Sequence, residues 1–415
     1  MPLRVEYPWK RGLFMEIDEN LERFLTYVKI DTQSDDTSNS TPSATKELDL
    51  ARQLMKELDE LGIPNELDEY GRVYAHLDGE KNLQTIGLNS HMDTALECSG
   101  KNVKPQIHEN YDGKDIALND EYTLSPKDFP ELLNHIGDTL VTTSGDTLLG
   151  GDDKAGVAII MSVLAYYVKH PEVKHHPIAI LFTPDEEIGR GPEHFDAKKF
   201  GAEFAYTIDG DFPTHIDIDN FNASHADLSF YGVGIHPGEA KGKMINAIRL
   251  AEEFDSLLDA NEKPEYTDGY NGFNHILSFQ GDATEAHLHY IIRNHDRNLL
   301  TKQKYEFVIA KEFLDKKYPN AKIELEIHDD YRNMKEILDK DPRAVEHAKK
   351  VFRSLGIEPV SLPVRGGTDG ATFSFLGCPT PNLGTGSYNH HGRFEYLSVR
   401  DFNQMFEIVK AIVKA

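Results

Sequence analysis

The chain has 415 residues, and its 44 Lys and Arg against 70 Asp and Glu give a formal net charge of -26 at pH 7. This charge repels phosphate backbones and anionic lipid surfaces, which argues against nucleic acid and membranes as partners. The chain is also too long for one ordinary core, so we expect two domains.

The cysteine count and the N-terminus bear on the compartment. Cys98 and Cys378 are too few for a disulfide framework and are typical of a reducing compartment. Residues 1–14 lack the apolar core of a secretion signal, and the sequence has no run of about 18 apolar residues that could span a membrane. These features predict a cytoplasmic protein.

Two amphipathic helices are predicted first. Apolar residues recur at helical spacing from Ile17 to Val28 and again from Leu50 to Leu61, and Gly62 ends the second helix. Three short apolar runs then resemble buried strands that end in polar clusters, at residues 85–88, 178–182 and 204–208.

A further helix, from Val157 to Val168, precedes the second of these strands. The alternation predicts an α/β sheet with helices on its faces. In such sheets the reactive groups lie beyond the carboxyl ends of the strands, which is where the acidic clusters of this sequence occur.

The pattern changes near Asp217. A strand, a helix, two strands, a helix and a strand are expected at residues 226–231, 245–258, 276–280, 287–292, 298–317 and 323–327. This βαββαβ order is that of a ferredoxin-like module. We therefore predict an inserted domain at residues 217–329 within a larger domain formed by residues 1–216 and 330–415, which ends in helices at 344–354 and 398–413.

A histidine and a carboxylate follow the first predicted strand. His91 and Asp93 are two residues apart, so on an extended chain they point the same way, and Asp93 can orient the imidazole from the side that faces away from a metal. A purely structural role remains an alternative, because His-x-Asp is a common pattern.

Two acidic clusters follow. Gly150 and Gly151 lead into a helix that begins with Asp152 and Asp153, where a helix N-cap is the competing explanation. Residues 185–187 are three consecutive acids, which repel one another unless a cation or solvent compensates them.

Asp209 follows the third strand, and His391 lies in a Gly-rich segment near the C-terminus. Each is weak evidence alone, but together two histidines and several carboxylates form the mixed ligand set suited to zinc, with cobalt or manganese as substitutes. The residues alone do not assign ligands, a bridging group or a general base.

The order and spacing of five motifs resemble the di-zinc exopeptidase family of aminoacylases and glutamate carboxypeptidases. Six further segments, among them His236-Pro-Gly, Arg365-Gly-Gly-Thr-Asp-Gly and Pro381-Asn-Leu, resemble its tripeptide aminopeptidase branch. The resemblance extends from about Met15 to the end. The five motifs are His91-Met-Asp93-Thr, Gly151-Asp152-Asp153-Lys154-Ala-Gly, Pro184-Asp-Glu186-Glu187, Asp209-Gly and Tyr388-Asn-His-His391-Gly.

The resemblance implies a fold and a metal site. The fold is a mixed-sheet zinc-exopeptidase catalytic domain with an inserted ferredoxin-like lid domain. Asp152 is expected to bridge two Zn²⁺ ions and to be followed by a cis peptide bond, while Asp93 orients His91 and Glu186 acts as the general base. The remaining expected ligands are His91 and Asp209 for one ion, and Glu187 and His391 for the other.

The resemblance also implies substrate contacts. His236 is expected to stabilise the oxyanion, and Arg293 and Arg365 are expected to bind the C-terminal carboxylate of a peptide. Two positions depart from the family: residue 294 is Asn where an acid is expected, and residue 390 is His where an aromatic residue is more frequent. The second departure raises the question of which histidine binds metal, and we choose His391 because it precedes the glycine.

The expected activity is release of the N-terminal residue from tripeptides by attack of zinc-bound hydroxide on the peptide carbonyl. Small peptides are then the partners, and a homodimer is compatible with this expectation. The alternatives are a dipeptidase, a carboxypeptidase or an N-acyl-amino-acid hydrolase on the same metals, and a non-catalytic peptide-binding descendant.

Overall fold

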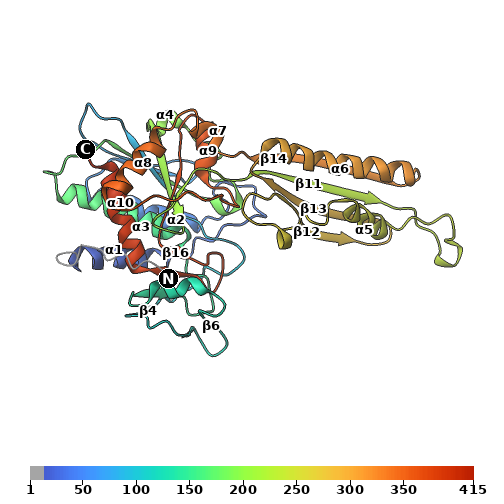
Figure 1. Cartoon of the computed structure of the whole chain (residues 1–415), viewed down its shortest axis with the longest axis horizontal. Coiled ribbons are helices and arrows are strands. Elements are labelled where there is room, and N and C mark those ends of the chain that lie inside the picture. The colour runs from blue at the N-terminus through green and yellow to red at the C-terminus, as the bar shows by residue number, and fades with distance from the viewer. Residues whose placement is uncertain (1–13) are drawn as a thin grey trace. The chain divides into compact units, whose positions relative to one another are not determined.

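The computed structural model describes residues 14–415, with the side chains from residue 19 onward. The predictions for the N-terminal segment and for the side chain of Ile17 therefore lie outside the described residues. The chain divides into two compact units. The first holds the chain up to Ile218, Ile337–Ser361 and Thr368–Ala415, and the second holds Asp219–Glu336 and Leu362–Gly367 (Figure 1).

The first unit is built on a seven-stranded sheet of order β1-β2-β8-β3-β9-β15-β10. The central strands β8, β3, β9 and β15 are parallel, whereas β1, β2 and β10 pair antiparallel at the edges. Four parallel strands therefore direct their carboxyl ends to one edge. The strands are β1 (Asn65–Leu67), β2 (Val73–Leu77), β3 (Ile86–His91), β8 (Ile178–Thr183), β9 (Phe204–Gly210), β10 (Ile216–Asp217) and β15 (Asn382–Gly384).

Helices cover both faces of this sheet. Alternate residues of β8 explain why: Ile178, Ile180 and Phe182 join the main core, whereas Ala179 and Leu181 join a smaller one. The main core includes side chains from α1 (Phe14–Tyr27), α2 (Glu47–Glu60), α3 (Gly151–Lys169), α8 (Arg343–Ser354) and α10 (Val399–Val413). The smaller core includes side chains from α4 (Ala197–Phe200) and α9 (Asp369–Phe375), and α7 (Lys335–Leu338) precedes α8.

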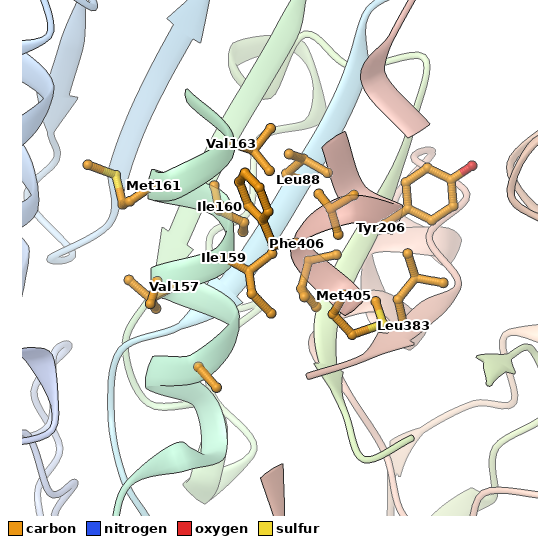
Figure 2. Close-up of a cluster of buried hydrophobic side chains, with 14 of the residues drawn as sticks. Leu88, Val157, Ile159, Ile160, Met161, Val163, Tyr206, Leu383, Met405 and Phe406 are labelled. Atoms are coloured by element: carbon orange, nitrogen blue, oxygen red, sulfur yellow. The ribbon is translucent and has the colours of Figure 1, made fainter. Parts of the chain in front are cut away.

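Figure 2 shows part of the main core, where α3 faces the sheet. Ile160 and Val163 of α3 lie near Leu88 of β3, and Phe406 of α10 inserts beside them. Because α3 is mostly apolar after its first turn and is buried along most of its length, its position on the sheet is fixed by packing. Its first residues are thereby held at the strand ends.

A second, smaller sheet of order β16-β17-β7-β4 lies in the same unit and was not predicted. Its strands have only two or three residues each, too few for a readable periodicity. It matters because its hairpin carries His391. The elements are β4 (Gln106–His108), β7 (Leu140–Thr142), β16 (Ser387–Tyr388) and β17 (Tyr396–Ser398), with the pair β5 (Ile116–Ala117) and β6 (Thr123–Leu124) and the short 3-10 helices η1 (Pro130–His135) and η2 (Glu186–Ile188) nearby in the chain.

The second unit has the predicted βαββαβ order and an antiparallel sheet of order β12-β13-β11-β14. Together with the mixed sheet of the first unit, this confirms the predicted fold class. The strands are longer than predicted, because polar residues alternate along their open face and interrupt the apolar runs. The elements are β11 (Asn222–Tyr231), η3 (Pro237–Glu239), α5 (Ala247–Leu257), η4 (Pro264–Tyr266), β12 (Phe273–Gly281), β13 (Glu285–Asn294), α6 (Arg297–Lys317) and β14 (Lys322–Tyr331).

Within residues 14–415, no helix combines the length and the apolar character needed to cross a lipid bilayer.

Candidate metal centre

The carboxyl ends of the central strands bring the predicted residues of the first unit together. His91 is the last residue of β3, Asp209 lies at the end of β9, and Glu186 begins η2 just after β8. Because these strands are parallel neighbours, their ends meet at one edge of the sheet. Asp152 joins them from the start of α3, and the peptide bond between Asp152 and Asp153 is cis, as predicted.

One group of possible ligands surrounds the imidazole of His91. Its Nε2 lies 2.9 Å from Oδ1 of Asp152 and 3.4 Å from Oδ1 of Asp209. The side chain of His91 is only 2% exposed, so this nitrogen faces the two carboxylates and not bulk solvent. His91, Asp152 and Asp209 thus present three donor atoms close enough to share one cation.

A second group uses the other oxygen of the same aspartate. Nε2 of His391 lies 3.2 Å from Oδ2 of Asp152 and 3.1 Å from Oε2 of Glu187. Asp152, Glu187 and His391 again place their donor atoms within reach of a single ion. Because Asp152 offers one oxygen to each group, its carboxylate lies between two candidate cation positions.

Asp93 organises the surroundings of both groups. It is completely buried, and its Oδ1 lies 3.3 Å from Nδ1 of His91, on the ring edge opposite Asp152. The same carboxylate accepts hydrogen bonds from the backbone N–H groups of Glu186 at 3.0 Å and Glu187 at 3.1 Å, and from the hydroxyl of Ser34 at 2.5 Å. It therefore orients the imidazole and the acidic turn together.

The electrostatics of the cluster favour a cation. Burial and the charge of Asp152 raise the pKa of Glu187 to about 7, even though His391 opposes the shift. Burial likewise raises the pKa of Asp209 to about 6. Oε1 of Glu187 is buried and accepts no hydrogen bond. Crowded, partly unsatisfied carboxylates with two imidazoles are the donor set expected for divalent zinc, so these residues fit that ion.

Glu186 differs from its neighbours because it belongs to neither ligand group. Burial, with the charges of Asp209, Asp369 and Glu187, raises the pKa of Glu186 well above its usual value, although His91 opposes this shift. A nearby divalent cation lowers such a pKa again. Glu186 therefore lies near the candidate ligands without belonging to either group.

His390 lies beside the cluster but contacts it differently from His391. Its Nδ1 is 3.4 Å from Oδ2 of Asp152 and 3.5 Å from Oδ1 of Asp211, and its Nε2 is buried with no hydrogen-bond partner. Only His391 of this pair approaches Glu187 in the ligand groups. Nδ1 of His391 in turn lies 3.5 Å from Oε1 of Glu97, an acid that the sequence patterns did not single out.

The remaining predicted residues belong to the second unit. Arg293 stacks on Tyr331 and donates to the carbonyl of Ser224, on the open face of the sheet. Asn294 points to the opposite face, where its side chain donates to Gln303, so its departure from the family pattern leaves that open face unaltered. His236 is exposed and caps η3 by accepting from the N–H of Gly238.

Arg365 is engaged within the second unit. Its guanidinium donates to the carbonyls of Gly269 at 3.0 Å and Asn271 at 2.7 Å and to the hydroxyl of Thr267 at 2.8 Å. It also lies over the rings of Phe221 and Phe273. These contacts hold the returning segment Leu362–Gly367 in this unit.

Sequence patterns also did not single out Glu395 and Asp369 as members of this region. Glu395 is buried and accepts from the backbone N–H of Asp152 at 3.0 Å, while Asp369 accepts from the hydroxyl of Thr183 at 2.6 Å. Neither lies at a ligand-like spacing from a histidine. Their roles depend on contacts between segments about 200 residues apart, which a single sequence does not reveal.

Comparisons with known proteins agree with this architecture. Residues 149–415 match the model of peptidase family M20/M25/M40. Peptidase T of Geobacillus thermodenitrificans is 50% identical over 401 residues, covering 95% of this chain and 98% of that protein. Peptidase T of Bacillus subtilis is 48% identical over 402 residues, covering 96% and 98%.

Solved structures share the fold. A tripeptidase from Staphylococcus aureus gives a TM-score of 0.78 at 21% identity, and aminopeptidase PepT from Bacillus cereus gives 0.76 at 21%. A dinuclear metal binding peptidase from Bacillus subtilis gives 0.61 at 13%. Each comparison covers 96% of this chain and 98% of the other.

Proposed function

The chain belongs to peptidase family M20/M25/M40 and, within it, to peptidase T, and from this premise we propose that it is a tripeptide aminopeptidase that works with two zinc ions. Cobalt and manganese are acceptable substitutes, because they accept the same imidazole and carboxylate donors. A cytoplasmic location and assembly as a homodimer are part of the proposal.

The carboxylate of Asp152, which both ligand groups share, is the main support for a site with two metal ions. Its Oδ1 is 2.9 Å from Nε2 of His91 and its Oδ2 is 3.2 Å from Nε2 of His391. A carboxylate flanked by two imidazoles in this way suits a bridge between two cations. Asp209 and Glu187 then complete one group each.

Cations held by the two ligand groups would polarise the peptide carbonyl and lower the pKa of a water molecule. Residues of the chain transfer the proton and hold the reacting groups in position. Glu186 accepts the proton of the attacking water and passes it to the leaving amine. Asp93 keeps Nε2 of His91 turned toward Asp152 and keeps the backbone of Glu186 in place through its N–H. Asp93 makes both contacts from a completely buried position.

Three residues are proposed to contact the peptide. We assign Arg293 and Arg365 to the C-terminal carboxylate and His236 to the oxyanion of the transition state. Arg293 suits this role because its guanidinium lies on the open face of the sheet. A guanidinium matches a carboxylate in shape and charge, so recognition of the C-terminus would measure the length of the peptide.

Hydrolysis of matched peptides tests the proposal. We expect the metal-loaded protein to cleave a tripeptide with a free N-terminus and to release its first residue, while the matching dipeptide and the N-acetylated tripeptide are poor substrates. Product analysis by mass spectrometry identifies the bond that is cut. Equal cleavage of the free and N-acetylated tripeptides would rule out an aminopeptidase and favour an acyl-amino-acid hydrolase.

A further inference from the structure

Glu395 is a buried carboxylate close to the candidate metal centre that has no place in the ligand groups. It lies in the loop that joins β16 to β17, on the same hairpin as His391, and is 1% exposed. An ionised group is costly to bury unless hydrogen bonds compensate it. The partners of this carboxylate therefore show what it does.

Those partners are backbone amides at the start of α3. Oε2 of Glu395 accepts from the N–H of Leu149 at 2.7 Å and of Gly150 at 2.8 Å, and Oε1 accepts from the N–H of Asp152 at 3.0 Å. The N–H groups of a first helical turn lack acceptors within the helix, and here the backbone of Asp152 is itself not helical. Glu395 satisfies this turn with three charge-assisted bonds.

The approach of the two segments is too close for a side chain. A Cβ placed on Gly151 would lie 2.1 Å from Oγ of Ser387 and 3.1 Å from Oε1 of Glu395. Glycine at this position therefore lets the turn lie directly against the hairpin. Two features therefore make the contact between the turn and the hairpin possible. The turn has no side chain at Gly151, and the hairpin contributes the buried carboxylate of Glu395.

We propose that Glu395 is a positioning residue that fixes Asp152 against His391, so that one aspartate serves both metal positions. This inference rests on the proposed metal centre. Asp152 comes from the turn that Glu395 binds, and His391 comes from the hairpin that carries Glu395; their side chains meet at 3.2 Å. Without the anchor, the turn and the hairpin are free to separate, and the group formed by Asp152, Glu187 and His391 loses its geometry.

Glu395→Gln tests this role with little change in volume. Glutamine keeps one acceptor oxygen but replaces the other with an amide donor, so it cannot accept from all three N–H groups through its two ends. Partners of this kind typically change metal affinity by about 10- to 100-fold. We therefore expect zinc affinity, measured by chelator competition, to fall in that range. Excess zinc should restore kcat, with KM for tripeptide unchanged.

Asp138→Asn is the matched control. Asp138 is a buried carboxylate of the same unit that accepts from the N–H groups of Thr139 and Arg400 and the hydroxyl of Ser398, none of which is a candidate ligand. This variant should lose thermal stability without losing zinc affinity. The inference is overturned if Glu395→Gln binds two zinc ions with wild-type affinity, or if Asp138→Asn loses affinity equally.

A measurement on the unaltered protein covers the case in which Glu395→Gln does not fold. Hydrogen exchange of the peptide spanning residues 147–153 should be slow in the metal-free protein, because the anchor is made by protein groups alone. Fast exchange there that slows only on adding zinc would overturn the inference. If the unaltered protein binds no zinc, the proposed function fails instead, so the two failures are distinguishable.

Discussion

Glu186 and Glu187 are adjacent in sequence, yet the structure gives them different surroundings. Oε2 of Glu187 faces Nε2 of His391 at 3.1 Å, within a ligand group. Glu186 lies outside both groups, and its backbone N–H is held by Asp93. Removing the carboxylate of Glu186 should therefore affect proton transfer, whereas removing that of Glu187 should affect metal binding.

Glu186→Gln should reduce kcat by about 10²- to 10⁴-fold, the usual contribution of a positioned general base, while zinc content stays near two per chain. Glu187→Gln is the paired variant and should lose zinc. Metal analysis beside steady-state kinetics separates the two effects. Wild-type turnover by Glu186→Gln would remove this residue as the base.

Arg293 tests recognition of the peptide C-terminus. Losing a charge-assisted hydrogen bond costs about 1.5 to 3 kcal/mol, so Arg293→Ala should raise KM for a tripeptide by about tenfold or more. A tripeptide amide, which has no terminal carboxylate, should be little affected. Arg249→Ala, in an exposed guanidinium of the same unit, is the control. An equal loss on acid and amide would contradict the assignment.

At the residue scale, the sequence could predict what depends on local order. Asp93 follows His91, the last residue of β3, by two positions, and the structure places Oδ1 of Asp93 3.3 Å from Nδ1 of His91. Spacing in the sequence could not distinguish His390 from His391, because both lie near Asp152 and the difference between them is the contact of His391 with Glu187 at 3.1 Å. The hydrogen bonds of Glu395 could not be predicted either, because they join two segments that are far apart in the sequence.

Among the elements, the second unit shows how one sheet and two helices share a core. Phe254 of α5 is fully buried and its ring lies 5.7 Å from that of Phe230 in β11 and 5.8 Å from that of Phe307 in α6. Both helices thus meet the sheet through a single aromatic cluster. Phe254 therefore packs against both the sheet and the second helix of this core.

Phe254→Ala should destabilise this unit by about 3 to 5 kcal/mol, because it opens a cavity among well-packed rings. Urea unfolding, with hydrogen exchange of β11 as a local probe, measures the loss. Tyr305→Ala, in an exposed side chain of α6, should change stability by about 0.5 kcal/mol or less. Zinc content should not change, because no candidate ligand lies in this unit. A loss below 1 kcal/mol would show that the cluster does not hold the unit together.

Element order was predictable, while element length was less so. Strand β3 extends to His91, beyond its predicted end at Leu88, because Asn89 and Ser90 continue it as buried polar residues. The sequence placed His91 after this strand, but the polar residues gave no sign that the strand itself continues to the histidine. The two-residue strand β16 carried no periodicity at all, so the hairpin that presents His391 could not be foreseen.

At the scale of the whole molecule, metal binding and proton release should be coupled. Hydrogen bonds with Asp152 and Glu187 raise the pKa of His391 to about 12, and burial raises the pKa of Glu187 to about 7 in the metal-free protein. At pH 7 His391 is therefore protonated and Glu187 is partly protonated. Ligands must lose these protons before they bind a cation.

Zinc binding at pH 7 should therefore release at least one proton, and apparent affinity should rise with pH between about 6 and 8. Titration calorimetry in two buffers of different ionisation enthalpy measures the number released. An observed heat that does not depend on the buffer would contradict the protonation states assigned to His391 and Glu187.

Zinc titration of chelator-treated protein tests the proposed two-zinc aminopeptidase activity. Tripeptide cleavage should be absent from the metal-free protein and should return as zinc approaches two per chain, with no matching activity on the N-acetylated tripeptide. Full activity without metal, or equal cleavage of the acetylated peptide, would rule out a two-zinc aminopeptidase.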